Sequence, residues 1–299
     1  MQTINKLIET IDTAIDKFNS SIPSLQKRID SELRILVKDL DTKGDNIVQS
    51  VSNLRKLAKI QKALQDILNT PEYIDAVKEF ANSFKEVETL NNTYFREVSK
   101  SYSPNDFLVE LRKQSVQTAV ESLTGSGINQ NVTSKLSDLI FESIKTGSSY
   151  NKLLDNLRSN VLTDANGVGQ LERYARQITT DSLNQFNASY QDNVTQDLGL
   201  EWYMYTGALI DTSRDFCKAC VEKKYIHKSE LDSVVKGDFA EFKKIDGKIN
   251  PKTKLPYGMI DGTNSVNVVI RRGGYGCGHK MIAVSSLVVP KELRMKFEK

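Results

Sequence analysis

Apolar residues recur at three- and four-residue steps through most of the first two thirds of the chain, and this spacing predicts a series of amphipathic helices. The first stripe lies on one helical face and consists of Ile4, Leu7, Ile8, Ile11, Ile15 and Phe18. We expect Pro23 to interrupt this helix, because a proline ring and the missing N–H do not fit a helix interior. Two further stripes predict a second helix that ends near Gly44 and a third that runs from Ile47 to Leu68.

The sequence Thr70-Pro71-Glu72 is typical of a helix start, with an N-cap, a proline at the first helical position and an acid in the first turn. The helix that follows is predicted to end in the polar stretch 85–105, which we interpret as a frayed end and a hinge. Shorter helices are predicted over 104–122, 136–144 and 153–161, and a long one over 171–196, with turns that contain glycine between them.

The pattern changes at Glu201, where Trp202 and Met204 alternate with Tyr203 and Tyr205 in the period of two that is typical of a strand. Residues 266–270 and 280–284 are the other predicted strands. The predicted fold class is α+β, with an elongated, mainly helical N-terminal part followed by a small mixed α/β C-terminal domain. We expect N-terminal packing or docking helices over 1–100, a connecting region of short helices over 101–170 and the C-terminal domain over 171–299.

Composition supports exposed helices and a soluble class of protein. Apolar residues make up 39% of the 299 positions, which favours elongated helices over one thick core. The formal net charge of +3 lacks the clustered basic charge of a strong duplex-binding protein, although local contact with nucleic acid stays open. No run approaches the about 20 apolar residues that span a bilayer, and the first residues lack the features of a secretory signal. We therefore expect synthesis in a reducing cytoplasm and no membrane partner.

Three thiols and one imidazole in the last third of the chain are the ligand set of a closed structural zinc site. The candidate metal ligands are a CxxC pair and a second pair two positions apart: Cys217, Cys220, Cys277 and His279. Glycines at 274, 276 and 278 permit the positive-φ turns that a close approach to a metal requires. We predict a zinc staple formed by these four residues, with His227 as a competing fourth ligand.

Other interpretations of these residues stay open. The cysteines are also compatible with small buried apolar side chains, and the CxxC pair with a redox or disulfide pair. Cys277 and His279 also have the residue types of a nucleophile and its base, so a hydrolase or toxin-like enzyme is one alternative. A zinc-stabilised nucleic-acid-binding protein is another. Four protein ligands leave no open position for a catalytic zinc, and no GxSxG, HExxH or P-loop motif occurs, so we predict that the protein is not an enzyme.

The last two fifths of the chain resemble the C-terminal domain of the Mu-F-like phage head morphogenesis, or minor head, proteins. That family has a helix rich in Arg, Thr and Ala that leads into a Trp-bearing strand, then an Asp-x-x-x-Arg-x-x-Cys-x-x-Cys segment and a later turn that contains Cys and His or a second Cys. The matching stretches in this chain are Tyr174–Ser182, Trp202, Asp211–Cys220 and Gly273–Val284.

The resemblance implies a virion protein, present in few copies at the portal vertex of the capsid, that acts by binding during head morphogenesis and genome packaging or delivery. Its implied partners are the portal protein and other head proteins, with the packaged DNA as a further contact and the N-terminal helices as the docking part. One residue departs from the family pattern: Gly278 separates Cys277 from His279, where the family usually has Arg. We expect Arg271 or Arg272, in the preceding strand, to supply that charge.

Overall fold

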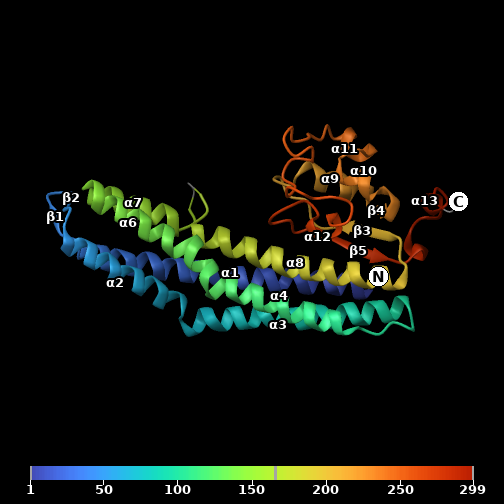
Figure 1. Cartoon of the computed structure of the whole chain (residues 1–299), viewed down its shortest axis with the longest axis horizontal. Coiled ribbons are helices and arrows are strands. Elements are labelled where there is room, and N and C mark those ends of the chain that lie inside the picture. The colour runs from blue at the N-terminus through green and yellow to red at the C-terminus, as the bar shows by residue number, and fades with distance from the viewer. Residues whose placement is uncertain (1, 165–166, 298–299) are drawn as a thin grey trace. The chain divides into compact units, whose positions relative to one another are not determined.

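The computed structural model describes residues 2–164 and 167–297, and most of these residues are helical (Figure 1). The helices are α1 (Gln2–Lys38), α2 (Val51–Leu68), α3 (Pro71–Val98), α4 (Asp106–Thr124), α5 (Ser126–Ile128), α6 (Ser134–Thr146), α7 (Tyr150–Val161), α8 (Gln170–Leu198), α9 (Asp215–Lys223), α10 (Leu231–Val235), α11 (Ala240–Lys244), α12 (Val268–Arg271) and α13 (Lys291–Arg294). A π-helical turn η1 (Asn129–Thr133) and the 3₁₀ turns η2 (Lys228–Glu230) and η3 (Ser286–Val288) complete the helical elements described. The strands are β1 (Thr42–Lys43), β2 (Asn46–Ile47), β3 (Trp202–Thr206), β4 (Tyr225–His227) and β5 (Lys280–Val284). The prediction of a mainly helical chain with a small sheet is confirmed.

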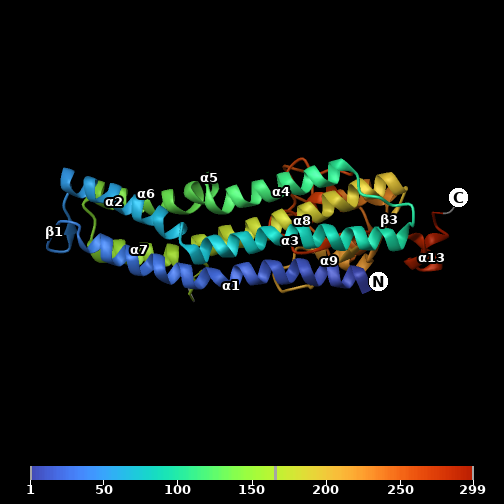
Figure 2. The same cartoon turned by 90° about the horizontal axis from the view of Figure 1, so that it is seen from below.

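Close contacts divide the chain into two compact units, each built from segments that are far apart in sequence. The first unit comprises Met1–Thr13, Ser83–Ser115 and Thr180–Lys299, and the second comprises Ala14–Asn82 and Val116–Thr179. Helices α1, α3, α4 and α8, which can be followed in Figure 2, contribute residues to both units. The predicted division into three successive regions at residues 100 and 170 stays a prediction.

Pro23 does not interrupt the first helix, contrary to prediction: α1 runs on to Lys38. An internal proline costs a helix about 3 kcal/mol, whereas each fully buried large apolar side chain contributes about 1.5–3 kcal/mol. Several such side chains are buried on both sides of Pro23, and packing therefore outweighs the lost hydrogen bond: Phe18, Ile22, Leu25, Ile29 and Leu33. The hydroxyls of Ser20 and Ser21 also donate to main-chain carbonyls of the preceding turn, at 2.7 Å each.

Helix α3 begins at Pro71, as predicted, but the hinge predicted over 85–105 is wrong for most of its length, because α3 continues to Val98. The polar side chains of this stretch form hydrogen bonds between helices. Asn91 is fully buried, and its amide donates to Asn187 Oδ1 of α8 at 2.9 Å and to its own helix at Val87 O at 3.0 Å. Gln191 of α8 donates to Asn91 Oδ1 in return.

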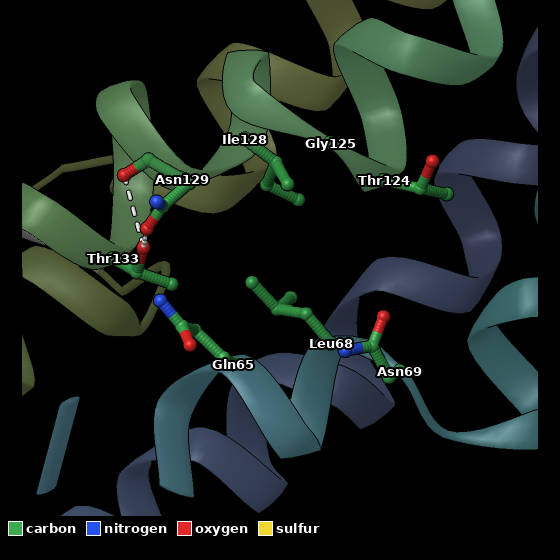
Figure 3. A pocket seen from close by; sticks show the side chains of 8 residues that line it. All are labelled: Gln65, Leu68, Asn69, Thr124, Gly125, Ile128, Asn129 and Thr133. Carbon is green, nitrogen blue, oxygen red and sulfur yellow. Dashed lines mark hydrogen bonds between the residues drawn. The ribbon is translucent and has the colours of Figure 1, made fainter. Parts of the chain in front are cut away.

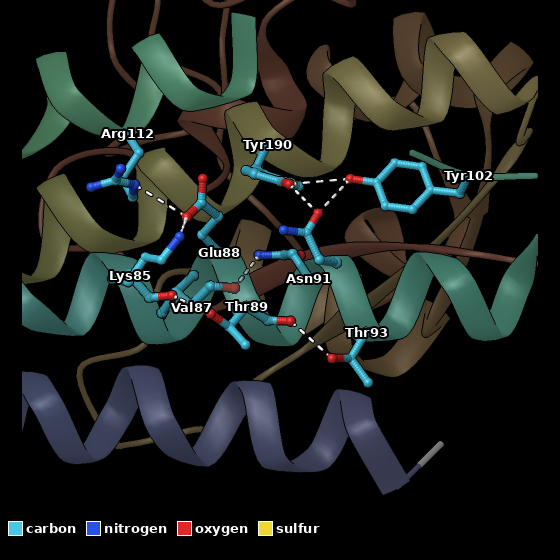
Figure 4. Close-up of polar contacts among 10 residues, drawn as sticks. Lys85, Val87, Glu88, Thr89, Asn91, Thr93, Tyr102, Arg112 and Tyr190 are labelled. Atoms are coloured by element: carbon cyan, nitrogen blue, oxygen red, sulfur yellow. Dashed lines mark hydrogen bonds and ion pairs between the residues drawn. The ribbon is translucent and has the colours of Figure 1, made fainter. Parts of the chain in front are cut away.

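A buried polar seam therefore joins α3, α4 and α8 in the first unit (Figure 4). Tyr102 and Tyr190 both donate to Asn92 Oδ1, at 2.8 and 2.6 Å. Glu88 is nearly inaccessible to solvent, and its carboxylate accepts from Lys85 at 2.6 Å and lies 3.1 Å from Arg112 Nε. The charge and the amides of the stretch are thus satisfied inside the unit.

The small sheet has the order β4-β3-β5 and is antiparallel throughout. Tyr203 on the central strand pairs with Ile226 on one side and Ala283 on the other. The strands predicted at 202–205 and 280–284 are confirmed, whereas the three-residue β4 was not predicted. Both faces of β3 are covered, since Trp202, Tyr203, Met204 and Tyr205 are all buried.

The strand predicted over 266–270 is wrong, because this segment forms a turn and the short helix α12. Local side-chain bonds decide the conformation. Asn264 Oδ1 accepts from the backbone N–H of Val266 at 2.9 Å and of Asn267 at 3.3 Å, and Asn267 Nδ2 donates to Gly262 O at 3.1 Å. Asparagine bonds of this kind offer the backbone an alternative to a strand ladder, and Val266 remains exposed.

Candidate metal centre

Three of the four predicted ligands lie together in the first unit. Cys217 belongs to the first turns of α9, while Cys277 and His279 precede β5. Cys277 Sγ is 3.8 Å from Cys217 Sγ and 3.7 Å from His279 Nδ1, and the ligand atoms of all three residues lie within 4.8 Å of one another. All three side chains are buried, so the cluster is closed to bulk water.

These separations have the lengths expected between ligand atoms of a tetrahedral zinc site. Zn–S bonds of about 2.3 Å and Zn–N bonds of about 2.0–2.1 Å at the tetrahedral angle place two sulfurs about 3.8 Å apart and a sulfur and a nitrogen about 3.6 Å apart. The sulfur–sulfur and sulfur–nitrogen distances of the cluster match both values. The ring of His279 also has a buried Nε2 with no hydrogen-bond partner among the described residues. The donor set and its spacing thus fit a soft divalent ion.

A glycine-rich turn makes room for the two sulfurs. A Cβ on Gly273 would lie 2.3 Å from Cys217 Sγ and 3.1 Å from Cys277 Sγ. Gly274 has a φ of +100°, and a Cβ there would lie 2.0 Å from Gly258 O. The turn is closed by the backbone N–H of Cys277, which donates to Gly274 O at 3.2 Å. Gly273 therefore allows the chain to pass directly over the two sulfurs, and Gly274 allows it to pass close to the backbone of Gly258.

The same turn is held from both sides by charged side chains. Asp181 of α8 accepts a hydrogen bond from Gly276 N–H at 2.7 Å, and Arg214, which precedes α9, donates to Tyr275 O at 2.7 Å. Burial raises the pKa of Asp181, although the bond from Gly276 acts in the opposite direction. Asp181 and Arg214 thus position the loop that carries Cys277.

Arg272 brings a positive charge into the interior beside the cluster. It is 1% exposed and adopts a φ of +45°, and its Nη1 donates to Ile270 O at 2.7 Å and to Asn184 O at 3.2 Å. Arg271, in contrast, reaches the rim and donates to Asp261 O at 3.0 Å. The charge expected from one of these two arginines is therefore next to the cysteines at Arg272, which follows α12 rather than a strand.

The pKa values of the two clustered thiols shift in opposite directions. A hydrogen bond from Cys217, the bond to His279 and the positive charge of Arg272 lower the pKa of Cys277, although burial acts in the opposite direction. The same bond to Cys277, together with burial, raises the pKa of Cys217. A metal ion bound here would displace the remaining thiol protons, because cysteine binds a metal as the thiolate.

The structure leaves two other candidate ligands outside the cluster. Cys220 is fully buried on α9, and burial raises the pKa of its thiol, but it is not among the three clustered groups. His227 lies on β4, where its ring packs against Trp202 and its Nδ1 bonds Ser229 Oγ at 2.7 Å. The role of Cys220 as a ligand stays a prediction.

Three residues of the site escaped the sequence analysis: Tyr205, Asp181 and Gly273. Asp181 and Gly273 lie inside the motif stretches, but only the folded chain shows what they touch. Tyr205 was predicted only as a strand residue. Its hydroxyl donates to Cys217 Sγ at 3.5 Å and lies 3.9 Å from Cys277 Sγ, and its ring stacks on His279.

The second unit contains a pocket between the end of α2 and the π-helical turn η1 (Figure 3). It has a volume of about 200 Å³ and a lining of amides, hydroxyls and aliphatic groups: Gln65, Leu68, Asn69, Thr124, Gly125, Ile128, Asn129 and Thr133. Its lining includes no acid, base or thiol, and Thr133 already donates to Asn129 Oδ1 across the turn. The Cys–His cluster is therefore the better candidate site.

Among the described residues, none of the helices is both long and apolar enough to cross a membrane. The chain matches no protein-family model, no curated protein and no solved structure.

Proposed function

We propose that the protein is a phage minor head protein that acts by binding, and that a zinc ion held by Cys217, Cys277 and His279 stabilises its C-terminal region. The protein is proposed to work at the portal vertex, with the portal protein and other head proteins as partners and DNA as a further contact during packaging or delivery. Its helices would then supply the docking surfaces.

One observation carries the proposal: three of the four stretches behind the family resemblance meet at the Cys–His cluster, namely Tyr174–Ser182, Asp211–Cys220 and Gly273–Val284. Asp181 comes from the first stretch, Arg214 and Cys217 from the second, and Cys277 and His279 from the third. The contacts Asp181–Gly276, Arg214–Tyr275 and Cys217–Cys277 tie them together. Sequence stretches that follow the order of the family pattern and contact one another in the fold are what a structural core shared with that family would require.

Burial of the cluster supports a structural role over catalysis. Cys277 and His279 are 2% and 7% exposed, so the carbonyl of a substrate has no approach to the sulfur. The 3.7 Å between Cys277 Sγ and His279 Nδ1 matches two ligands of one ion. A structural zinc ion contributes directly to the free energy of folding, which suits a small sheet with short strands.

The metal is tested by elemental analysis of the purified chain. We expect about one zinc per chain in wild type and in the control variant Lys218→Ala, which changes the residue next to Cys217 but keeps both thiols. Cys217→Ala is expected to lose the zinc and to unfold at a lower temperature, because the tetrahedral site needs both thiolates. Wild-type protein without metal, together with an unchanged melting temperature for Cys217→Ala, would contradict the zinc site.

The head function is tested in the virus itself. Mass spectrometry of virions is expected to find the chain at a few copies for each portal, far below the major capsid protein. Co-expression with the portal protein of the same genome is expected to give a complex in size-exclusion chromatography. A chain that is missing from virions and migrates separately from the portal protein would disprove this function and leave the zinc site untouched.

A further inference from the structure

Tyr205 lies against the two sulfurs of the cluster, whereas Cys220 is not among the clustered groups. The tyrosine lies on the central strand β3 and is buried, and its hydroxyl faces both sulfurs, at 3.5 Å from Cys217 Sγ and 3.9 Å from Cys277 Sγ. Its ring stacks on His279, with centroids 5.7 Å apart and planes 25° apart. The phenol of Tyr205 thus contacts both sulfurs and the imidazole ring, and these four groups come from three separate segments of the chain.

The distances fit an oxygen ligand. Zn–O bonds of about 2.0–2.2 Å and Zn–S bonds of about 2.3 Å place oxygen and sulfur about 3.5–3.7 Å apart in a tetrahedral site. The hydroxyl of Tyr205 lies 3.5 Å from Cys217 Sγ, within this range, and 3.9 Å from Cys277 Sγ, slightly above it. Cys220 is three residues beyond Cys217 on the same helix but is not one of the clustered groups.

We infer that the phenol oxygen of Tyr205 is the fourth ligand of the metal ion, in the place where a CxxC motif would put Cys220. The inference rests on the zinc site proposed above and concerns the identity of its last ligand. Coordination breaks the O–H bond of the phenol and forms a Zn–O bond, and the proton passes to solvent. The ion then has two thiolates, a phenolate and a neutral imidazole around it.

The interior can hold the resulting charge. A divalent ion with three anionic ligands leaves one net negative charge, and the guanidinium of Arg272 is buried beside Cys277, where its positive charge acts on that sulfur. A buried charge is tolerated when an opposite charge accompanies it. With Tyr205 as a ligand the tetrahedron is complete and holds no position for a substrate, in keeping with a structural site.

X-ray absorption at the zinc edge of the purified full-length protein counts the sulfur ligands directly. We expect two sulfurs and two light atoms in wild type and the same shell in Cys220→Ala. Zinc added to metal-free protein is expected to produce the ultraviolet difference spectrum of a tyrosinate, and Tyr205→Phe is expected to lack it and to bind zinc at least 10-fold more weakly. Both wild-type measurements stand even where a variant folds poorly.

Two results would overturn the inference while leaving the zinc site intact. A shell of three sulfurs that becomes two in Cys220→Ala would assign the fourth position to Cys220. Two sulfurs without a tyrosinate spectrum would place water or another light atom there. Wild-type protein that binds no zinc would instead refute the proposed metal site itself.

Discussion

Two glycines of the same turn differ sharply in what a methyl group would meet. At Gly273 a Cβ would press against both Cys217 Sγ and Cys277 Sγ, whereas at Gly278 it would find open space. Neither residue has a left-handed φ that would strain an alanine. Substitutions at these two positions therefore distinguish the effect of filling the space beside the sulfurs from the effect of making the turn less flexible.

Gly273→Ala is expected to abolish zinc binding, or to weaken it at least 100-fold, because the new methyl group occupies the space of the two sulfurs. Overpacking of this kind also costs about 1–3 kcal/mol of folding stability. Gly278→Ala is the matched control and should keep both properties. Zinc titration and thermal unfolding of the two variants provide the check. Equal affinities would show that the cluster is looser than the distances indicate.

Among the helices, the buried seam of α3, α4 and α8 depends on amides. Asn91 accepts from Gln191 and donates to Asn187, so truncation leaves buried polar groups on α8 without their partners. Each such group costs about 1–3 kcal/mol. Thr93 lies nearby on the same helix but is exposed and bonds only within it, to Thr89 O at 2.9 Å (Figure 4).

Asn91→Ala is therefore expected to lower the free energy of unfolding by about 2–5 kcal/mol, and Thr93→Ala to stay within about 0.5 kcal/mol of wild type. Urea denaturation followed by circular dichroism measures both. A loss for Asn91→Ala no larger than that for Thr93→Ala would mean that water replaces the missing amide.

The spacing of apolar residues predicted most helices, because the buried face of a helix has an apolar residue every three or four positions, whichever element packs against it. It failed at Pro23, at the asparagines of α3 and at Val266, and the causes are physical. Packing on both sides of Pro23 outweighs one lost hydrogen bond. Asn91 reads as a helix end but is satisfied by another helix, and Asn264 holds a turn where β-branched residues indicated a strand.

The site was predicted in part for a similar reason. Cysteine and histidine are recognised as candidate ligands by residue type, so the clustered residues Cys217, Cys277 and His279 could be named from the sequence. Their meeting depends on α9 and β5 both packing on β3, which no local pattern shows. Tyr205 resembles any aromatic strand residue until its hydroxyl is seen against the sulfurs.

For the molecule as a whole, the first unit draws on three stretches of chain. Strand β5 receives bonds from the distant stretches: Tyr94 donates to Ala283 O at 2.8 Å, and Lys280, buried at the start of the strand, pairs with Asp12. A fragment 171–299 would keep all the candidate ligands but lose both contacts.

We expect such a fragment to lack a cooperative thermal transition even with zinc present, whereas the full chain unfolds cooperatively. Differential scanning calorimetry of the two proteins compares them directly. A sharp transition in the fragment would show that the region from 171 onward folds by itself, as the predicted domain division holds.

The ion pair of Asp12 and Lys280 joins residues 268 positions apart, and this separation sets an order of events during synthesis. A ribosome that adds about 5–20 residues per second makes Lys280 on the order of tens of seconds after Asp12. All segments of the second unit have by then been made. Throughout that interval the N-terminal segment of the first unit lacks its contact with β5, so the first unit cannot be completed until the chain is almost fully made.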